Sequence, residues 1–339
     1  MLKIYTDQQF IKEENRKCIF PLLFDLCYSK NEHLLKYYEL MNQMEDAEVV
    51  IVPVDISEFF QKQQQDWLYA FIDRALALHK KVWVYSAGDF GLSLKKAVYT
   101  FRLSGFDSKM DANTFVLPSF IEDPYLKIQK EFQPIVKDLH PKIGFVGHAS
   151  NSWAKWAKEA LVFLLHNYKR FFKVLFTDYQ HFYPSSIKRY KFLSFLQKNN
   201  QIETAFILRD KYRAGVKTEE DKNKTTLEFL KNMHANPYTF CLRGAGNYSV
   251  RLYETLAMGR IPVVIETDFR LPLEGIIKWK EHCLIVTEKN MCNALIDFHQ
   301  KISEDNFQKI QFNNRNLWIQ FLNREAYFSK LSTIFQDKL

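Results

Sequence analysis

Short apolar segments alternate along the chain with longer segments whose apolar residues recur at helical spacing. The segments AEVVIVPVDI (47–56) and KKVWVYSAGD (80–89) are rich in β-branched residues, and QQDWLYAFIDRALALHK (64–80) between them has the periodicity of an amphipathic helix. A strand, a helix and a strand in this order predict a unit of parallel sheet. ANTFVLPSF (112–120) predicts one more strand.

Prolines interrupt the segment that follows, PSFIEDPYLKIQKEFQPIVKDLHPK, at positions 118, 124, 134 and 141. We interpret residues 121–141 as a crossover between domains, because a regular core element would not tolerate this spacing of prolines. The alternation then restarts with a strand at 142–147, a glycine turn and a helix from about Ser152.

The second alternation continues to about residue 290. It predicts strands in QIETAFILRDKYRAG, YTFCLRG, IPVVIE and HCLIVTE, and helices in KTTLEFLKNMHANP and SVRLYETLAMG. We therefore predict an α/β fold with an N-terminal domain over 1–120, a second domain over 142–290, and C-terminal helices over 291–339 that pack back on the N-terminal domain. Trp153 and Trp156, three residues apart, are interpreted as helix packing, with stacking on a sugar ring as the alternative.

The charge of the chain is uneven and narrows the classes of ligand. Of the net charge of +8, none comes from residues 1–120, which hold 14 basic and 16 acidic residues against 33 and 23 in the remainder. A basic second half suits an anionic ligand, a nucleic acid or an acidic membrane surface, and it is also compatible with an ordinary basic surface. Charge alone does not choose among these.

The compartment follows from cysteine usage and hydropathy. Five scattered cysteines form no C-x-x-C pair and do not indicate a disulfide framework. The N-terminus MLKIYTDQQF has no continuous apolar stretch, and no run approaches the roughly 18 apolar residues of a membrane span. We expect a cytoplasmic protein with at most peripheral membrane contact.

The segment YTFCLRGAGNYSVRLYETLAMGRIPVVIETD (238–268) carries the candidate chemistry. Arg243 leaves a predicted strand, and Gly244 and Gly246 allow backbone to approach a ligand closely. Ser249 is placed to cap a helix over about 249–258, whose N-terminus favours an anion, and Gly259 is placed to stop that helix.

Arg251 and Glu254, three residues apart, are predicted to share one face of this helix. Amide groups and arginine suit a diphosphate, and a glutamate suits ribose hydroxyls, so the arrangement fits a nucleoside diphosphate. An exposed ion pair between Arg251 and Glu254, with glycines that only form a turn, is the structural alternative. GAG here is neither a G-x-G-x-x-G fingerprint nor a P-loop.

The run RGAGNYSVRLYETLAMGRIPVVI, followed by LPLEGIIKW, resembles the exostosin-like glycosyltransferase family, whose pattern combines R-G, S-x-R-x-x-E and G-x-I-P-V. The similarity spans roughly residues 115–290. It implies a GT-B architecture, two Rossmann-like domains with parallel sheets facing a cleft. It also implies inverting sugar transfer without a D-x-D metal motif, and the chain has no D-x-D.

The resemblance also implies roles for particular residues. Arg251 would meet the diphosphate and Glu254 the ribose of a UDP- or GDP-linked sugar. One of Arg209, Lys211 and Arg213, which follow the preceding strand, would join the phosphates; for any single member of this cluster, a solvated surface position is the favoured interpretation. The family's usual cysteine in G-C-I-P is Arg260 here, a departure expected to bear on donor preference. The predicted donor site comprises Arg209, Lys211, Arg243, Gly244, Gly246, Asn247, Ser249, Arg251 and Glu254, with Arg213 as a further member of the basic cluster.

An inverting transfer needs a general base on the acceptor hydroxyl. Asp7, Asp55, Asp89 and His148 follow predicted strands or lie in loops, and we select Asp55 and His148 as the candidates. For His148, a capping or core histidine is at least an equal interpretation.

The sequence therefore predicts a glycosyltransferase that moves a sugar from a nucleoside diphosphate to a saccharide or lipid-linked saccharide, in synthesis of a cell-surface polysaccharide. No cofactor or metal is expected besides the nucleotide-sugar donor. The alternative is a noncatalytic nucleotide- or anion-binding module that keeps the donor loop. A nucleic-acid binder ranks below both, since no helix-turn-helix, zinc-ligand or ribonucleoprotein signature is present.

Overall fold

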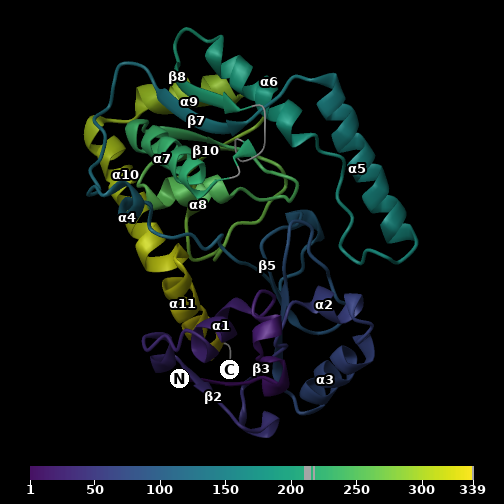
Figure 1. Cartoon of the computed structure of the whole chain (residues 1–339). Coiled ribbons are helices and arrows are strands. Elements are labelled where there is room, and N and C mark those ends of the chain that lie inside the picture. The colour runs from purple at the N-terminus through teal and green to yellow at the C-terminus, as the bar shows by residue number, and fades with distance from the viewer. Residues whose placement is uncertain (210–214, 217, 338–339) are drawn as a thin grey trace. The chain divides into compact units, whose positions relative to one another are not determined.

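The chain divides into two compact units in a computed structural model that describes residues 1–209, 215–216 and 218–337 (Figure 1). Unit 1 comprises Met1–Pro118, Asn167–Gln180 and Arg324–Leu339. Unit 2 comprises Ser119–His166 and His181–Asn323. Each unit contains one sheet in which all paired strands are parallel.

The sheet of unit 1 has six strands in the order β2-β1-β3-β4-β5-β6. The strand β3 is buried on both faces, as expected of a parallel strand covered by helices. The strands are β1 (Leu2–Tyr5), β2 (Tyr38–Leu40), β3 (Val49–Ile51), β4 (Lys81–Ser86), β5 (Tyr99–Arg102) and β6 (Thr114–Val116). The helices are α1 (Pro21–Cys27), α2 (Ile56–Gln61), α3 (Gln65–Ala77) and α11 (Arg324–Gln336).

The C-terminal helix α11 completes unit 1. Its backbone carbonyl at Phe328 accepts a hydrogen bond of 2.7 Å from the Tyr38 hydroxyl, and the Tyr327 hydroxyl donates to the carbonyl of Val116 at 3.1 Å. The ring of Phe335 lies 4.6 Å from that of Trp83. These buried contacts make α11 a core element of unit 1, although the strands of that unit lie more than two hundred residues earlier in the chain.

The sheet of unit 2 has five strands in the order β11-β10-β9-β7-β8. The strands are β7 (Lys142–His148), β8 (Glu203–Arg209), β9 (Tyr238–Cys241), β10 (Ile261–Ile265) and β11 (Leu284–Val286). The chain proceeds from β7 to β8 on one side and then returns to place β9 on the other side of β7. The strand order thus reverses between β7 and β9, and ligands of open α/β sheets bind at such a point, beyond the carboxyl ends of the strands.

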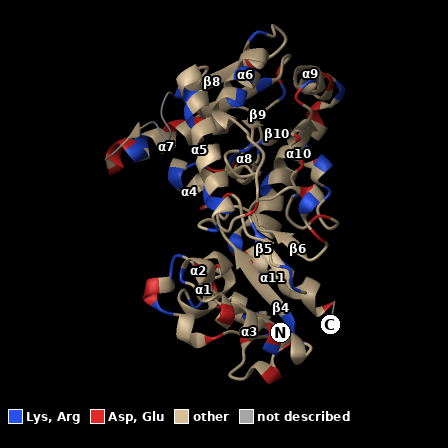
Figure 2. Ribbon diagram, turned by 90° about the vertical axis from the view of Figure 1, so that its right-hand side faces the viewer, with Lys and Arg blue, Asp and Glu red and all other residues tan. Residues whose placement is uncertain are grey.

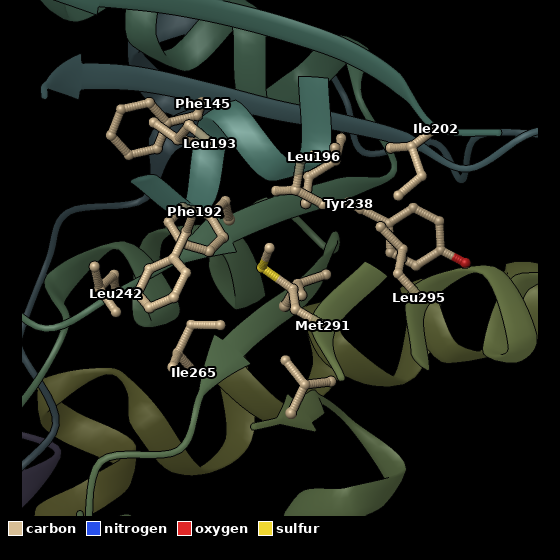
Figure 3. Close-up of a cluster of buried hydrophobic side chains, with 14 of the residues drawn as sticks. Phe145, Phe192, Leu193, Leu196, Ile202, Tyr238, Leu242, Ile265, Met291 and Leu295 are labelled. Atoms are coloured by element: carbon tan, nitrogen blue, oxygen red, sulfur yellow. The ribbon is translucent and has the colours of Figure 1, made fainter. Parts of the chain in front are cut away.

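Helices flank this sheet and supply its core. They are α4 (Pro124–Ile128), α6 (Ser185–Gln197), α7 (Glu219–Ala235), α8 (Val250–Ala257), α9 (Met291–Lys301) and α10 (Glu304–Leu317), with a π-helical turn over Trp318–Leu322. Phe192 and Leu196 of α6 and Met291 and Leu295 of α9 meet the sheet in one buried cluster (Figure 3). Helix α5 (Trp153–Phe171) begins in unit 2 and ends in unit 1.

The sequence patterns anticipated most of these elements. The strands predicted at 47–56, 80–89, 112–120 and 142–147 are confirmed as β3, β4, β6 and β7, and the α/β fold class with two parallel-sheet units is confirmed. The division of the chain differs from the predicted one, because residues 167–180 lie in unit 1 and the segment 291–339 divides at Arg324. The sequence analysis did not indicate β1, β2 and β5.

Candidate functional site

The loop between β9 and α8 lies at the point where the strand order of unit 2 reverses. Ser249 occupies the N-cap position of α8, and the helix ends at Ala257 with Gly259 just beyond it. Gly259 has φ of +64°, and a Cβ there would lie 2.3 Å from Cε2 of Phe132, so both backbone and packing require glycine. The predicted helix and its stop are therefore confirmed.

Arg251 extends from α8 to the end of β7. Its Nη2 donates a 2.8 Å hydrogen bond to the carbonyl of Val146, and its guanidinium lies 4.4 Å from the centre of the Phe145 ring. Its Nε is buried and has no hydrogen-bond partner among the described residues. Burial lowers the pKa of this guanidinium, because desolvation disfavours its charged form.

Arg189 of α6 is the functional candidate that the sequence did not indicate. Its Nη1 donates to the carbonyl of His148 at 2.7 Å, and its guanidinium shares the Phe145 ring with Arg251, at 5.9 Å. Burial, and then the neighbouring charge of Arg251, lower its pKa to about 10. In the sequence it stands within SSIKRYKFL, which resembles an ordinary solvated basic helix face.

These two guanidiniums lack an ion-pair partner within 4.0 Å in the part of the chain that the structure describes. Two other arginines of low side-chain exposure do have one: Arg315 forms a two-pronged pair with Asp123, and Arg102 pairs with Asp178 at 2.8 Å. A buried charge without a partner costs several kcal/mol, of the order expected for an effective desolvation penalty. An anion bound between Arg189 and Arg251 would compensate both charges.

The remaining loop residues shape this site. The Arg243 guanidinium lies 4.6 Å from the centre of the Tyr183 ring, and its Nη2 donates to the carbonyl of Ala245 at 2.9 Å. At Gly244, a Cβ would meet no atom within 4 Å, so the space above the strand end is open. Gly246 is buried within the loop. Glycine at 244 is thus not required by packing of the protein itself.

Asn247 and Ser249 differ in how they are used. Asn247 is buried, and its Nδ2 donates to the carbonyls of Thr267 and Asp268 at 2.8 and 2.9 Å, which ties the loop after β9 to the loop after β10. Asn247 therefore positions the loop. The Ser249 hydroxyl makes no capping hydrogen bond to α8 despite its N-cap position. Its predicted capping bond is absent, and the hydroxyl can bond to a ligand instead.

Glu254 lies one turn further along α8. Burial raises the pKa of its carboxyl, while Arg251 and Lys127 act in the opposite direction. None of the described residues donates a hydrogen bond to this carboxylate. A buried carboxylate with unused lone pairs is suited to accept hydrogen bonds from ligand hydroxyls.

His148 ends β7 beside the two arginines. Its Nδ1 lies 2.9 Å from the carbonyl of Arg209, so Nδ1 carries the proton and Nε2 presents a lone pair. This Nε2 is buried and unbonded among the described residues. The Arg209 side chain, in contrast, pairs with Glu228 of α7 at 2.6 Å, which neutralises its charge. Lys211 and Arg213 lie outside the described residues.

Asp55, the other candidate base, caps a helix of unit 1. Its Oδ1 accepts from the backbone amides of Ser57 at 3.2 Å and Ala87 at 3.1 Å, and its Oδ2 accepts from the Ser57 hydroxyl. Burial raises its pKa, and these hydrogen bonds act against the shift. The carboxylate has a structural task at the N-terminus of α2, which is a sufficient reason for an aspartate here.

Arg260 is placed away from the loop that its sequence position suggested. Arg260 is buried just before the first residue of β10, whereas the loop after β9 lies at the carboxyl ends of the strands. It donates hydrogen bonds to the carbonyls of His234 and Gln133 at 2.9 and 3.1 Å. It also lines a hollow of about 580 Å³ with residues of 130–135. This position gives no support to the expectation that Arg260 bears on donor preference. Arg260 fixes the crossover segment to the sheet.

Neither a metal-binding cluster nor a membrane-spanning helix is present among the described residues. Within residues 1–209, 215–216 and 218–337, we find no group of three or more His, Cys, Asp or Glu placed to hold a metal ion. In the same ranges, no helix combines the length and apolar character needed to cross a bilayer.

Comparison with known proteins finds a family match over a part of the chain that includes much of this site. Residues 176–302 match the Exostosin GT47 domain, a range that includes α6, the loop after β9 and α8. A probable glucuronosyltransferase of Oryza sativa subsp. japonica is 28% identical over 109 residues, which is 32% of this chain and 25% of the rice protein. A probable glucuronoxylan glucuronosyltransferase of Arabidopsis thaliana is 32% identical over 76 residues, 22% of this chain and 17% of that protein.

The chain thus spans about a quarter or less of the length of these plant relatives. Among solved structures, Anabaena HepE in complex with UDP-glucose aligns over 100% of both chains, with 11% identity and a TM-score of 0.37. The match of residues 176–302 to the Exostosin GT47 domain confirms the resemblance predicted from the loop after β9.

Proposed function

We propose that the protein is an inverting, metal-independent glycosyltransferase that uses a nucleoside-diphosphate sugar. The observation that carries this proposal is the pair of half-buried arginines, Arg189 and Arg251, whose Nε atoms are buried and which lack carboxylate partners among the described residues. Both lie at the reversal of strand order. The N-terminus of α8 adds its dipole at the same edge. Three sources of positive potential converge where a diphosphate would bind.

The donor is held in two parts. Arg251, Arg189 and the α8 N-terminus meet the diphosphate and stabilise its charge as the glycosidic bond breaks, which is the larger electrostatic requirement of the reaction. The Glu254 carboxylate accepts hydrogen bonds from the ribose hydroxyls. The names of the plant relatives concern glucuronosyl transfer, which supports a sugar nucleotide as donor and leaves UDP and GDP both open.

The acceptor in this proposal is a saccharide or a lipid-linked saccharide of a cell-surface polysaccharide. His148 is the favoured general base, because its Nε2 presents a buried lone pair and its ring is fixed through Nδ1. Asp55 is the second candidate, and its three hydrogen bonds as a helix cap weigh against it.

The experiment is calorimetric titration of the full chain with UDP and with GDP in EDTA. We expect one nucleotide to bind without metal, and Arg189→Met to weaken it at least about tenfold, since hydrogen bonds to charged groups contribute about 1.5–3 kcal/mol. Lys191→Met, an exposed lysine on the same helix, is the matched control and should bind normally. If neither nucleotide binds, the donor-site proposal is wrong.

A noncatalytic nucleotide-binding module with the same loop is the alternative function. It is separated from an enzyme by turnover rather than by binding. Release of nucleotide from the cognate sugar nucleotide, measured with a panel of saccharide acceptors, would support the enzyme. Binding of the donor with no release under any acceptor would favour the module.

A further inference from the structure

Helix α5 differs from an ordinary surface helix in the side chains that it exposes. Its 19 residues, Trp153–Phe171, extend for about 28 Å. The less exposed side carries polar side chains that have partners: the Glu159 carboxylate accepts from the Ser186 hydroxyl, and Arg170 donates to the carbonyl of Thr177 at 3.0 Å. Phe163, on the same side, has its ring centre 5.4 Å from that of Phe182.

The outward side of α5 is apolar. Trp153, Leu164 and Phe171 fall on one line along the helix and are 77%, 61% and 81% exposed. Leu161, Leu165 and Tyr168 are exposed beside them, and Phe172 and Val174 continue the exposed apolar surface beyond the helix end. A surface helix normally turns its apolar side to the core. An outward apolar face of this kind indicates a surface that takes a partner.

The charges around this apolar face are of one sign. Lys158 and Lys169, three turns apart, lie along one edge, and Lys173 follows the helix. The only acidic side chain of α5 is Glu159, on the opposite side. Aromatic residues at the ends, leucines in the middle and a basic edge are the composition of helices that lie in the interface of an anionic membrane.

We propose that the outward face of α5, with residues 172–174, docks on the surface of an anionic lipid bilayer. The helix lies along the interface, since no described helix qualifies as a membrane span. A second copy of the chain is a poorer occupant, because two-fold pairing of this face would bring the two basic edges together. A nucleic acid would not require the exposed leucines. This inference does not depend on the proposed function.

The test is flotation of the full chain with vesicles of phosphatidylcholine alone or mixed with phosphatidylglycerol. We expect flotation with the mixed vesicles, reduced by salt, and little with phosphatidylcholine. The double substitution Leu161→Glu with Leu164→Glu should reduce the partition coefficient between vesicles and buffer by at least about tenfold. It places negative charge on the face of α5 that would enter the lipid surface. The control is Leu139→Glu, at an 86% exposed leucine outside α5, which should float as the unaltered chain does.

A second pair of substitutions addresses the basic edge. Lys158→Glu with Lys169→Glu should remove the preference for phosphatidylglycerol, several-fold per lysine. Circular dichroism of each variant should be unchanged, since all these side chains are exposed. Absence of flotation of the unaltered chain would overturn the proposal, as would flotation indifferent to the leucine pair. A dimer in analytical ultracentrifugation that the leucine pair dissociates, without vesicle binding, would assign the face to a second copy.

Discussion

Replacing Arg251 by methionine separates a ligand-binding arginine from a structural one. In the free protein the change removes one hydrogen bond to the carbonyl of Val146 and the contact with Phe145, each about 1 kcal/mol. It also removes the desolvation cost of a guanidinium without a carboxylate partner, which is several kcal/mol for a buried ion and smaller for this half-buried residue. The free energy of unfolding should therefore change by no more than about 1 kcal/mol.

Arg315→Met provides the contrast within the same unit. Arg315 pairs with Asp123, so its loss leaves a carboxylate of low exposure without its partner. The expected loss is about 3 kcal/mol, at the lower end for broken buried pairs, because Asp123 keeps 25% of its side-chain exposure. Nucleotide affinity should be unchanged at a temperature where the variant is folded.

For Arg251→Met we expect the opposite effect on binding. Loss of charge-assisted hydrogen bonds to a diphosphate, about 1.5–3 kcal/mol, weakens the affinity roughly tenfold to 150-fold. The assays are urea denaturation followed by circular dichroism and calorimetry with the nucleotide that binds the unaltered chain. The reasoning is refuted if Arg251→Met loses about 3 kcal/mol of stability and keeps its affinity, since Arg251 would then act as Arg315 does.

Four further substitutions test other parts of the site. Gly244→Val should leave the melting temperature nearly unchanged and abolish nucleotide binding in calorimetry, because a Cβ at this position has no protein atom within 4 Å and the side chain extends into the open space; a strongly lowered melting temperature would contradict this account. Glu254→Gln should raise the melting temperature near neutral pH and weaken nucleotide binding about tenfold. Burial raises the pKa of Glu254 in the folded protein, so the charged carboxylate lowers the free energy of unfolding at pH values above that pKa. The difference in melting temperature between Glu254→Gln and the unaltered chain should therefore shrink and vanish as the pH falls below that pKa. A difference independent of pH would count against a carboxylate that is charged and desolvated. In a transfer assay, His148→Asn should lower kcat about 100-fold or more while Asp55→Asn, which can still cap α2, keeps activity; the reverse result would make Asp55 the base.

The sequence by itself determined the local features of this protein. Alternation of apolar runs with helical periodicity predicted both parallel sheets, since burial on both faces leaves a short, continuous signature. The spacing S-x-R-x-x-E placed Arg251 and Glu254 on one face of a helix, and Gly259 marked its end. These features depend on residues within a few positions of one another, so a single sequence is enough to read them.

Other features depended on contacts between segments far apart in the chain. Arg189 joins the site only because α6 packs beside β7 and β9, and Arg209 is neutralised only because α7 brings Glu228 to it. Asp55 proved to be the N-cap of α2. Arg260 proved to lie at the start of β10, away from the carboxyl ends of the strands where the candidate site lies.

The outward apolar face of α5 is the plainest case of a feature that the sequence left undecided. Its amphipathic pattern was visible in the sequence, yet the pattern is the same whether the apolar side faces the core or the solvent. Periodicity defines two sides of a helix, and only packing against Phe182 and Ser186 decides which side is outside. The periodicity of a helix does not say which of its sides packs against the protein until the tertiary structure places another segment against one of them.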